Sequence, residues 1–317
     1  MNSVIRGIGA ALPKKLILNT DFPDSLNTSD EWIRQRTGIT QRYVASEGET
    51  TASLATEAAK RALQHAQASI DDVDLIIVAT TSGDYTFPST ACVVQKNLEI
   101  KKGFALDISA ACSGFVYALD LADSYIKLGK ATCAIVIGAE TFSKIVDWND
   151  RSTCVLFGDG AGAVILKGEE SELGIQICKT YSDGSFVEFL QTSGGVSTTA
   201  TAGHILMHGR EVFKFAIEKF AESFDEILKI SNLSVNDIDL VIPHQANYRI
   251  IEKFIEISGI SAEKVLVTMN KHANTSAASI PLALNEVRDS VFSKKNVVLL
   301  SMGAGFTWGS ALIKFKI

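Results

Sequence analysis

The segment DVDLIIVAT at residues 72–80 recurs as DIDLVIPHQ at residues 237–245, an offset of 165 positions. Each copy follows a long amphipathic helical pattern, at 50–66 in one case and at 210–230 in the other. Continuous apolar runs of this length are typical of strands that are buried on both faces of a sheet. The same order of helix and strand in both places indicates two related α/β halves.

Two further pairs of segments support this duplication. CAIVIGAE from residue 133 matches NVVLLSMG from residue 296, at an offset of 163, and AVILK from 163 matches ALIKF from 311, at an offset of 148. The smaller last offset predicts an extra segment of roughly 15 residues in the first half, around 143–159. The alternative is that buried strands merely resemble one another in composition. We predict an N-terminal half over residues 1–170 and a C-terminal half over residues 171–317.

Composition limits the classes of function. The chain has 317 residues, of which 46% are hydrophobic, and a formal net charge of −6. It can bury a large core, and its charge argues against a general nucleic-acid binder. Its five cysteines show neither a CxxC pair nor zinc-ligand spacing. Four of them are interpreted as reduced core thiols, which suits the cytoplasm. We see no signal-peptide pattern and no run long enough to span a membrane.

The fifth cysteine has two interpretations. Cys112 lies in LDISAACSGFVYALDLA (106–122), between a strand-like run and a helix-like run. Unpaired N–H groups and the dipole at a helix N-terminus lower the pKa of a thiol and make it nucleophilic. The small neighbours would let a substrate approach the backbone. From these residues alone, a buried structural thiol remains the favoured alternative.

Two polar residues in the second half are candidates for chemistry. His244 follows the strand-like run DLVIP, and it can donate a hydrogen bond to an oxyanion or exchange a proton near neutral pH. Asn274 in HANTSAAS can donate its amide to an oxyanion, although Asn before such a run is more often a helix N-cap. At an offset near 162, Asn274 is expected to lie opposite Cys112. A histidine satisfied within a loop is the alternative for His244.

Other motifs carry less information. SMGAGFTWGS (301–310) and FGDGAGAV (157–164) are neither GxGxxG nor Walker sequences, so they indicate tight turns rather than a nucleotide site. Arginine can hold phosphates and tryptophan can stack on adenine. Taken singly, however, Trp32, Arg36 and Arg151 are as well explained by ordinary surface placement.

Together, these stretches closely resemble β-ketoacyl-acyl-carrier-protein synthase III, a condensing enzyme of the thiolase-fold superfamily, from end to end. The resemblance is carried by SDEWIRQRTGI (29–39), FPSTAC (87–92), DISAACSGF (107–115), FGDGAGA (157–163), SDG (182–184), IPHQAN (242–247), NTSAASIP (274–281) and GAGFTWGSAL (303–312). It implies an α/β, thiolase-like, five-layered αβαβα fold made of two duplicated halves, and a homodimer.

The resemblance also implies a reaction. Cys112 would take the acyl group of a short acyl-CoA, with acetyl-CoA the first choice, and the backbone N–H groups of Cys112 and Ala304 would bind the oxyanion. His244 and Asn274 would then stabilise the enolate formed by decarboxylation of malonyl-acyl-carrier protein, which attacks acyl-Cys112 to give the 3-oxoacyl product that initiates fatty-acid synthesis. It implies no metal and no redox cofactor, because the coenzyme A thioester is itself the substrate.

The same resemblance assigns further positions. The expected coenzyme A contacts are Thr28, Trp32, Arg36, Arg151, Gly209, Phe213, Ala246 and Asn247. The expected acyl pocket consists of Phe87 reaching across the dimer, together with Leu156, Phe157, Phe189 and Met302. The expected docking surface for the acidic carrier protein is Lys214, Arg249 and Lys253.

The chain departs from the family pattern at several places. Ala273 stands where glycine is usual, Ala304 replaces one of three frequent glycines, and Arg210 stands where asparagine is common. Glu252 and Glu256 make the docking surface less basic. These departures leave the acyl group and the strength of carrier docking open. The alternatives are a condensing enzyme or acyltransferase of secondary metabolism and, more remotely, a non-catalytic acyl-CoA-binding paralogue.

Overall fold

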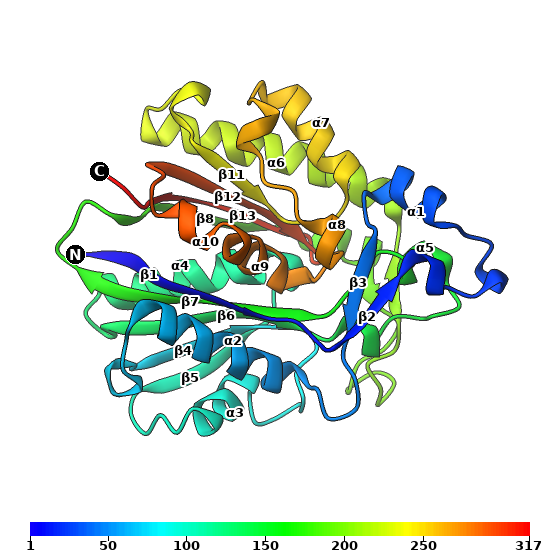
Figure 1. Cartoon of the computed structure of the whole chain (residues 1–317), viewed down its shortest axis with the longest axis horizontal. Helices are drawn as coiled ribbons and strands as arrows, with labels where there is room; N and C mark the ends of the chain where they lie inside the picture. Colours follow the sequence, from blue (N-terminus) through cyan, green and yellow to red (C-terminus); the bar gives the residue numbers. More distant parts are fainter.

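The computed structural model describes all residues, 1–317, and contains two large mixed sheets (Figure 1). The first sheet has the order β1-β7-β6-β4-β5. β4 is parallel to β5 and β6, whereas β7 is antiparallel to β6 and β1. Its strands are β1 (Asn2–Ala11), β4 (Leu75–Ala79), β5 (Phe104–Ile108), β6 (Cys133–Glu140) and β7 (Gly160–Glu169).

The second sheet repeats this pattern in the order β11-β12-β13-β8. β11 is parallel to β12, and β13 is antiparallel to β12 and to β8. The equivalent of β5 is reduced to one bridge between Val241 and Val265. The strands are β8 (Gly174–Ser182), β11 (Leu240–Pro243), β12 (Asn296–Gly303) and β13 (Thr307–Lys314). The chain passes from the first sheet to the second between Glu169 and Gly174.

The predicted extra segment lies in the connection between β6 and β7. Residues 141–159 join these strands, whereas only residues 304–306 join the equivalent strands β12 and β13. The longer connection carries a 3₁₀ turn, Phe142–Lys144, and helix α5 (Arg151–Cys154). The fall in the repeat offset therefore has a structural cause.

Two helices lie between the sheets, α4 (Gly114–Lys127) and α9 (Ser279–Glu286), as Figure 1 shows. The outer face of the first sheet is covered by α2 (Thr51–Ala66) and α3 (Thr90–Asn97), and that of the second by α6 (Gly209–Ser231) and α7 (Tyr248–Ser258). This arrangement is the predicted five-layered αβαβα fold. None of the helices is both long and apolar enough to cross a bilayer.

Each buried strand contributes side chains to two hydrophobic cores, because successive side chains point to opposite faces of a sheet. In β4, Leu75 and Ile77 pack in the central layer with α4 and α9, whereas Ile76 and Val78 pack in the outer layer with α2. β12 alternates in the same way between the central layer and the layer under α6 and α7. The uninterrupted apolar runs follow from this burial on both faces.

Smaller elements lie at the right of Figure 1. They are α1 (Asp30–Thr37), the hairpin β2 (Lys15–Leu18) with β3 (Gln41–Val44), the hairpin β9 (Leu190–Thr192) with β10 (Ile205–Met207), and the short helix α8 (Met269–His272). The short helix α10 (Arg288–Val291) instead follows α9, and its Val291 packs in the core of the central layer. Residues of α1, β10 and α8 join the buried core beneath α6 and α7.

Candidate active site

The two central helices begin at equivalent turns that contact each other. A 3₁₀ turn, Ala111–Ser113, precedes α4, and a second, Ser276–Ala278, precedes α9. Ala111 (φ 44°) and Ser276 (φ 49°) both have left-handed backbone, which marks the same position in each half. They are 165 residues apart, so the counterpart of Cys112 is Ala277. The expectation that Asn274 is this counterpart is wrong, because the offset between the two halves is 165 residues here rather than 162.

Cys112, His244 and Asn274 nevertheless line one cavity, as the sequence predicts. Cys112 comes from the turn before α4, His244 follows β11, and Asn274 lies between α8 and the turn before α9. All three side chains are buried. Three segments that are far apart in the sequence therefore meet at the inner ends of the central helices.

Burial changes the expected chemistry of Cys112. It raises the pKa of the thiol to about 12; a hydrogen bond with the Ser276 hydroxyl lowers the pKa and the nearby Glu140 raises it. The prediction of a lowered pKa is wrong for this structure, because desolvation of a thiolate outweighs the favourable helix end. The thiol is therefore protonated at neutral pH before a substrate binds.

His244 is held as a neutral imidazole. Its Nδ1 lies 2.6 Å from the Ser279 hydroxyl oxygen, and its backbone N–H donates to Leu300 at 2.7 Å. Burial lowers the pKa of His244 to about 3. The Ser279 hydroxyl has no other acceptor, so it donates to Nδ1, and this assignment leaves the proton of the ring on Nε2. Nε2 is then a hydrogen-bond donor.

Asn274 is oriented by the backbone around it. Its N–H donates to Leu156 at 2.9 Å, and its side-chain oxygen accepts from the Ser276 N–H at 2.9 Å. The Nδ2 group has no acceptor in the protein, so its two N–H donors are available to a ligand in the cavity. Asn274 and His244 thus present neutral hydrogen-bond donors to the cavity rather than charged groups.

The turn between β12 and β13 packs directly on the cysteine. A Cβ atom on Gly303 would lie 2.7 Å from the backbone nitrogen of Cys112, so only glycine fits there. The Ser113 hydroxyl donates to Thr307 O at 2.8 Å, and the Thr307 hydroxyl donates to Ala110 O at 3.1 Å. Ala304 lines a second hollow that also contains Cys112. The turn that contains Ala304 therefore lies beside the cysteine backbone, and its role in binding an oxyanion stays a prediction.

Most of the predicted contact residues share the cavity with Cys112. They are Gly209, Phe213, Ala246 and Asn247 of the coenzyme A set, and Leu156, Phe157 and Met302 of the acyl set. Within the acyl set, Phe189 does not line the cavity, which corrects the prediction for this residue. Its ring packs on Phe306 with centroids 6.3 Å apart, because the chain enters β9 here and turns the next residue, Leu190, toward the cavity.

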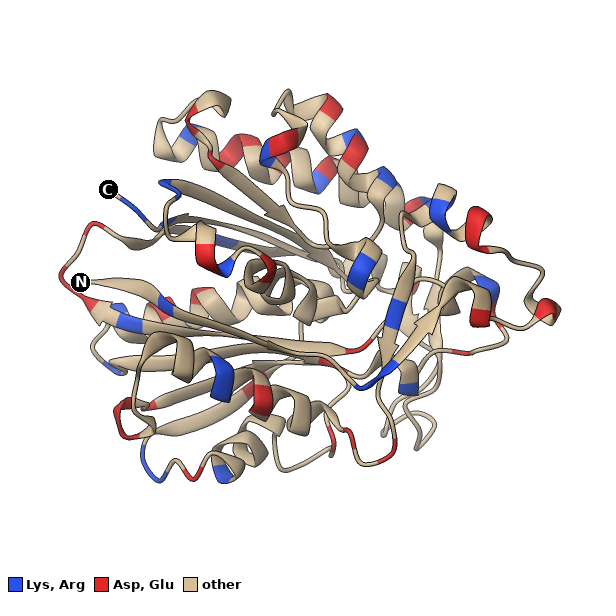
Figure 2. Ribbon diagram, viewed as in Figure 1, with Lys and Arg blue, Asp and Glu red and all other residues tan.

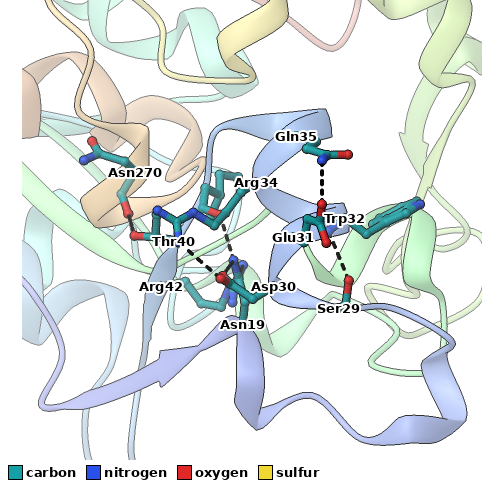
Figure 3. Close-up of polar contacts among 11 residues, drawn as sticks. Asn19, Ser29, Asp30, Glu31, Trp32, Arg34, Gln35, Thr40, Arg42 and Asn270 are labelled. Atoms are coloured by element: carbon teal, nitrogen blue, oxygen red, sulfur yellow. Dashed lines mark hydrogen bonds and ion pairs between the residues drawn. The ribbon is translucent and has the colours of Figure 1, made fainter.

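Trp32 lies between two arginines on the surface. The guanidinium carbons of Arg36 and Arg151 are each 4.9 Å from the Trp32 ring centroid. Arg151 also donates to the carbonyl of Asn27, next to Thr28. Figure 3 shows how polar contacts hold α1 in place: Asn19 donates to Asp30 at 2.9 Å, and the Thr40 hydroxyl donates to Asn270 O at 2.6 Å. Four of the predicted coenzyme A contacts therefore lie around one anchored helix, namely Thr28, Trp32, Arg36 and Arg151.

The predicted docking residues lie in a groove between α6 and α7. Lys214, Arg249 and Lys253 line it together with Glu252 and Glu256. Lys253 is paired with Glu256 at 2.7 Å, whereas Lys214 and Arg249 have no carboxylate partner. Figure 2 shows both signs of charge interspersed on these helices. The groove is thus only mildly basic, because most of its positive charge is balanced locally.

Phe87 does not reach the cavity of its own chain. It is 84% exposed on the segment between β4 and α3, and its neighbour Tyr85 is 64% exposed. This position fits the expectation that Phe87 serves a second copy of the chain.

Four residues near the nucleophile were not predicted from the sequence. Gly303 packs on the Cys112 amide, Ser279 holds the His244 ring, and the Ser276 hydroxyl donates to the buried Glu140. Two signals for them were present: both serines lie in NTSAAS, and Glu140 is a lone acid at the end of an apolar strand.

The duplicated fold and the buried cysteine, histidine and asparagine define a condensing acyltransferase of the thiolase fold. Residues 106–184 match the family model 3-oxoacyl-acyl-carrier-protein synthase III, and residues 228–315 match its C-terminal model. The chain therefore belongs to the β-ketoacyl-acyl-carrier-protein synthase III family.

Individual relatives agree over nearly the whole chain. The chain is 54% identical over 316 residues to β-ketoacyl-acyl-carrier-protein synthase III of Wolbachia pipientis wMel, with 99% of each covered. It is 52% identical over 321 residues to that of Paramagnetospirillum magneticum, again with 99% of each covered. The crystal structure of the Aquifex aeolicus enzyme superposes with a TM-score of 0.93 at 48% identity, covering 98% of this chain and 99% of that one.

Proposed function

We propose that the protein initiates fatty-acid synthesis by condensing a short acyl-CoA, with acetyl-CoA as the first candidate, with malonyl-acyl-carrier protein. The observation that carries this proposal is the meeting of Cys112, His244 and Asn274 in one buried cavity. The family relationship supports it, since the relatives are named for the same reaction. The reaction uses the coenzyme A thioester as substrate and requires neither a metal nor a redox cofactor.

Each residue has a distinct task in this proposal. Cys112 attacks the thioester, and the N–H groups of Cys112 and Ala304 hold the oxygen of the tetrahedral intermediate. Coenzyme A then leaves and malonyl-carrier protein enters. The Nε2–H of His244 and the Nδ2–H of Asn274 donate to its thioester oxygen and stabilise the enolate as carbon dioxide departs. A neutral histidine suits this task, because its donor is already in place before charge develops.

The substrates would reach the cavity along predicted surfaces. Trp32 and the two arginines stacked on it would contact the coenzyme A nucleotide, with Arg36 and Arg151 near the phosphates of the nucleotide. Lys214 and Arg249, which have no carboxylate partners, would meet the acidic carrier protein.

We also propose a homodimer in the cytoplasm. The exposed pair Tyr85 and Phe87 would be covered by a second copy, into whose acyl pocket Phe87 would reach. All five cysteines are free, which fits a reducing compartment.

Mass spectrometry of the intact protein mixed with acetyl-CoA tests the central step. We expect an acetyl adduct on Cys112 that is absent from Cys112→Ser, followed by 3-oxoacyl-carrier protein when malonyl-carrier protein is added. Failure to form the adduct with any short acyl-CoA would contradict the proposal.

A related activity in secondary metabolism is the second candidate. A priming β-ketosynthase of a polyketide pathway shares the fold at a TM-score of 0.92 and 29% identity. Comparing turnover of acetyl-, isobutyryl-, butyryl- and octanoyl-CoA with malonyl-carrier protein distinguishes the two. Turnover only with another acceptor would favour the second candidate.

A further inference from the structure

Arg42 is a fully buried cation, and none of the steps proposed for the reaction uses it. It lies in β3, and no carboxylate forms an ion pair with it. Its Nε and Nη1 groups have no hydrogen-bond partner in the protein, and its guanidinium carbon lies 4.8 Å from the centroid of the Phe22 ring. Burial lowers the pKa of Arg42 only to about 10, so the side chain is charged at neutral pH. Burying a charge without a counter-ion is costly, so this position requires an explanation.

One nitrogen of Arg42 connects two distant segments. Its Nη2 donates to the side-chain oxygen of Asn19 at 2.9 Å and to the carbonyl of Val155 at 3.0 Å. The Asn19 amide in turn donates to Asp30 Oδ1 at 2.9 Å and to the Ile39 carbonyl at 2.8 Å, as Figure 3 shows for Asp30. Both N–H groups of Nη2 and both N–H groups of the Asn19 amide are thereby used.

The first connected segment is helix α1, which carries two of the expected nucleotide contacts. Asp30 is the first residue of α1, and Trp32 and Arg36 lie on the same helix. Arg36 and Arg151 are both stacked on the Trp32 ring. The hydrogen bond from Asn19 to Asp30 therefore fixes the end of the helix from which Trp32 extends.

The second connected segment binds the backbone of Asn274. Val155 precedes Leu156 and Phe157, which line the cavity. The Leu156 carbonyl accepts from the Asn274 N–H at 2.9 Å, and the Asn274 carbonyl accepts from the Gly158 N–H at 3.0 Å. A displacement of the Val155 carbonyl would therefore be passed on to Asn274 through the next residue along the chain.

The chain next to Arg42 also contacts the residues that precede Asn274. The Thr40 hydroxyl donates to the Asn270 carbonyl at 2.6 Å, and the Gln41 amide donates to the Lys271 carbonyl at 3.2 Å. The segment 40–42 thus holds the chain on both sides of Asn274. An arginine suits this place, because its planar guanidinium presents two N–H groups to two acceptors at a fixed angle.

We propose that Arg42 is a positioning residue that holds the nucleotide-binding helix α1 in a fixed place relative to the segment that binds Asn274. This inference rests on the proposed function, since it concerns the coenzyme A thioester and the decarboxylation step. Arg42 acts through Asn19 on one side and through Val155 on the other. It thereby aligns a thioester bound at Trp32 with the donors in the cavity.

The test compares Asn19→Ala, which breaks the connection to α1 alone, with Arg42→Met, which removes both connections and the charge. Steady-state turnover with malonyl-carrier protein is measured for acetyl-CoA and for acetyl-pantetheine, which lacks the nucleotide. Malonyl decarboxylation is measured as the release of carbon dioxide, and thermal denaturation reports the folding of every variant. Arg61→Met is the matched control, because Arg61 also donates to a backbone carbonyl, that of Ala10 at 2.8 Å, but from α2 on the outer face of the first sheet.

For Asn19→Ala we expect KM for acetyl-CoA to rise about 10-fold, with KM for acetyl-pantetheine and the release of carbon dioxide unchanged. Arg42→Met should show the same rise and, in addition, a fall in carbon dioxide release of about 10- to 100-fold. Arg61→Met should keep the wild-type values. If Arg42→Met does not fold, Arg42→Lys takes its place and should show both changes at about 3-fold or more, because one flexible ammonium does not hold two acceptors at a fixed angle.

Three results would overturn the inference. They are wild-type kinetics in the folded variants, a lower melting temperature with unchanged KM values, and an equal rise in KM for both acetyl donors in Asn19→Ala. If the wild type itself turns over neither acetyl donor, the proposed function fails instead.

Discussion

The side-chain oxygen of Asn274 accepts a hydrogen bond from the backbone N–H of Ser276 at 2.9 Å. This contact decides which end of the amide faces the cavity, because the oxygen is already occupied and the Nδ2 group is not. Ser276 thereby orients Asn274 through its backbone and donates to the buried Glu140 through its hydroxyl.

Asn274→Asp tests the orientation of this amide. Aspartate can still accept from the Ser276 N–H, but it offers a negative oxygen where the amide offered donors. We expect the rate of malonyl decarboxylation, measured as the release of carbon dioxide, to fall about 100- to 1,000-fold. Acetylation of Cys112 should fall far less. Undiminished decarboxylation would remove Asn274 from the mechanism.

The buried His244 predicts a pH dependence of stability. Its pKa is about 3 in the folded protein and near 6.5 when unfolded, so the unfolded chain binds more protons below pH 6.5. The free energy of unfolding should therefore decrease as pH falls from 6.5 toward 3, with a contribution from His244 of up to about 1.4 kcal/mol per pH unit.

Urea denaturation of the wild type and His244→Gln at pH 7, 6 and 5 measures this contribution. The wild type should lose stability more steeply than the variant over this range. Parallel curves for the two proteins would show that the imidazole titrates normally.

Gly303→Ala tests the contact between the β12–β13 turn and the nucleophile. The new methyl group would lie 2.7 Å from the Cys112 nitrogen and 3.0 Å from the Ser113 nitrogen. We expect the turn to move, with a loss of stability of about 1–3 kcal/mol and a fall in Cys112 acetylation of about 100-fold. Gly184→Ala is the control, because a methyl there meets nothing within 4 Å. Equal behaviour of the two variants would contradict the contact.

Substitution of Ala273 by glycine is expected to cost little stability. Its backbone has φ 59° and ψ −161°, a region that is essentially restricted to glycine and costs other residues of order 1–3 kcal/mol. In Ala273→Gly, relief of this strain should offset the loss of a buried methyl group. Ala278→Gly, at a buried position with helical backbone, should instead lose about 1–2 kcal/mol. Thermal or urea denaturation compares them, and equal destabilisation would contradict the strain.

Trp32→Ala separates recognition of the nucleotide from the chemistry. Without the ring, Arg36 and Arg151 lose the surface on which both are stacked. We expect KM for acetyl-CoA to rise about 10-fold, since loss of such contacts costs of order 1–2 kcal/mol. KM for acetyl-pantetheine, which lacks the nucleotide, should not change. An equal rise for both substrates would place Trp32 elsewhere in the binding path.

The sequence by itself determined the architecture and the three central side chains. Its repeated helix and strand patterns predicted two α/β halves, because strands buried on both faces must be apolar at every position. The change in repeat offset located the long β6–β7 connection. Cys112, His244 and Asn274 were recognisable because the short motifs around them together resemble those of a known family, whereas each residue taken alone had a structural alternative.

Only the tertiary structure decided what surrounds these side chains. The pairing of Cys112 with Ala277 rather than Asn274 depends on backbone torsions at Ala111 and Ser276. Leu190 rather than Phe189 lines the cavity, and this depends on the direction in which side chains point where β9 begins. The hydrogen bond from the Ser276 hydroxyl to Glu140 joins two segments that are far apart in the chain. Burial raises the pKa of Cys112 and Glu140 and lowers that of His244, and burial is a property of the packed layers rather than of any one motif.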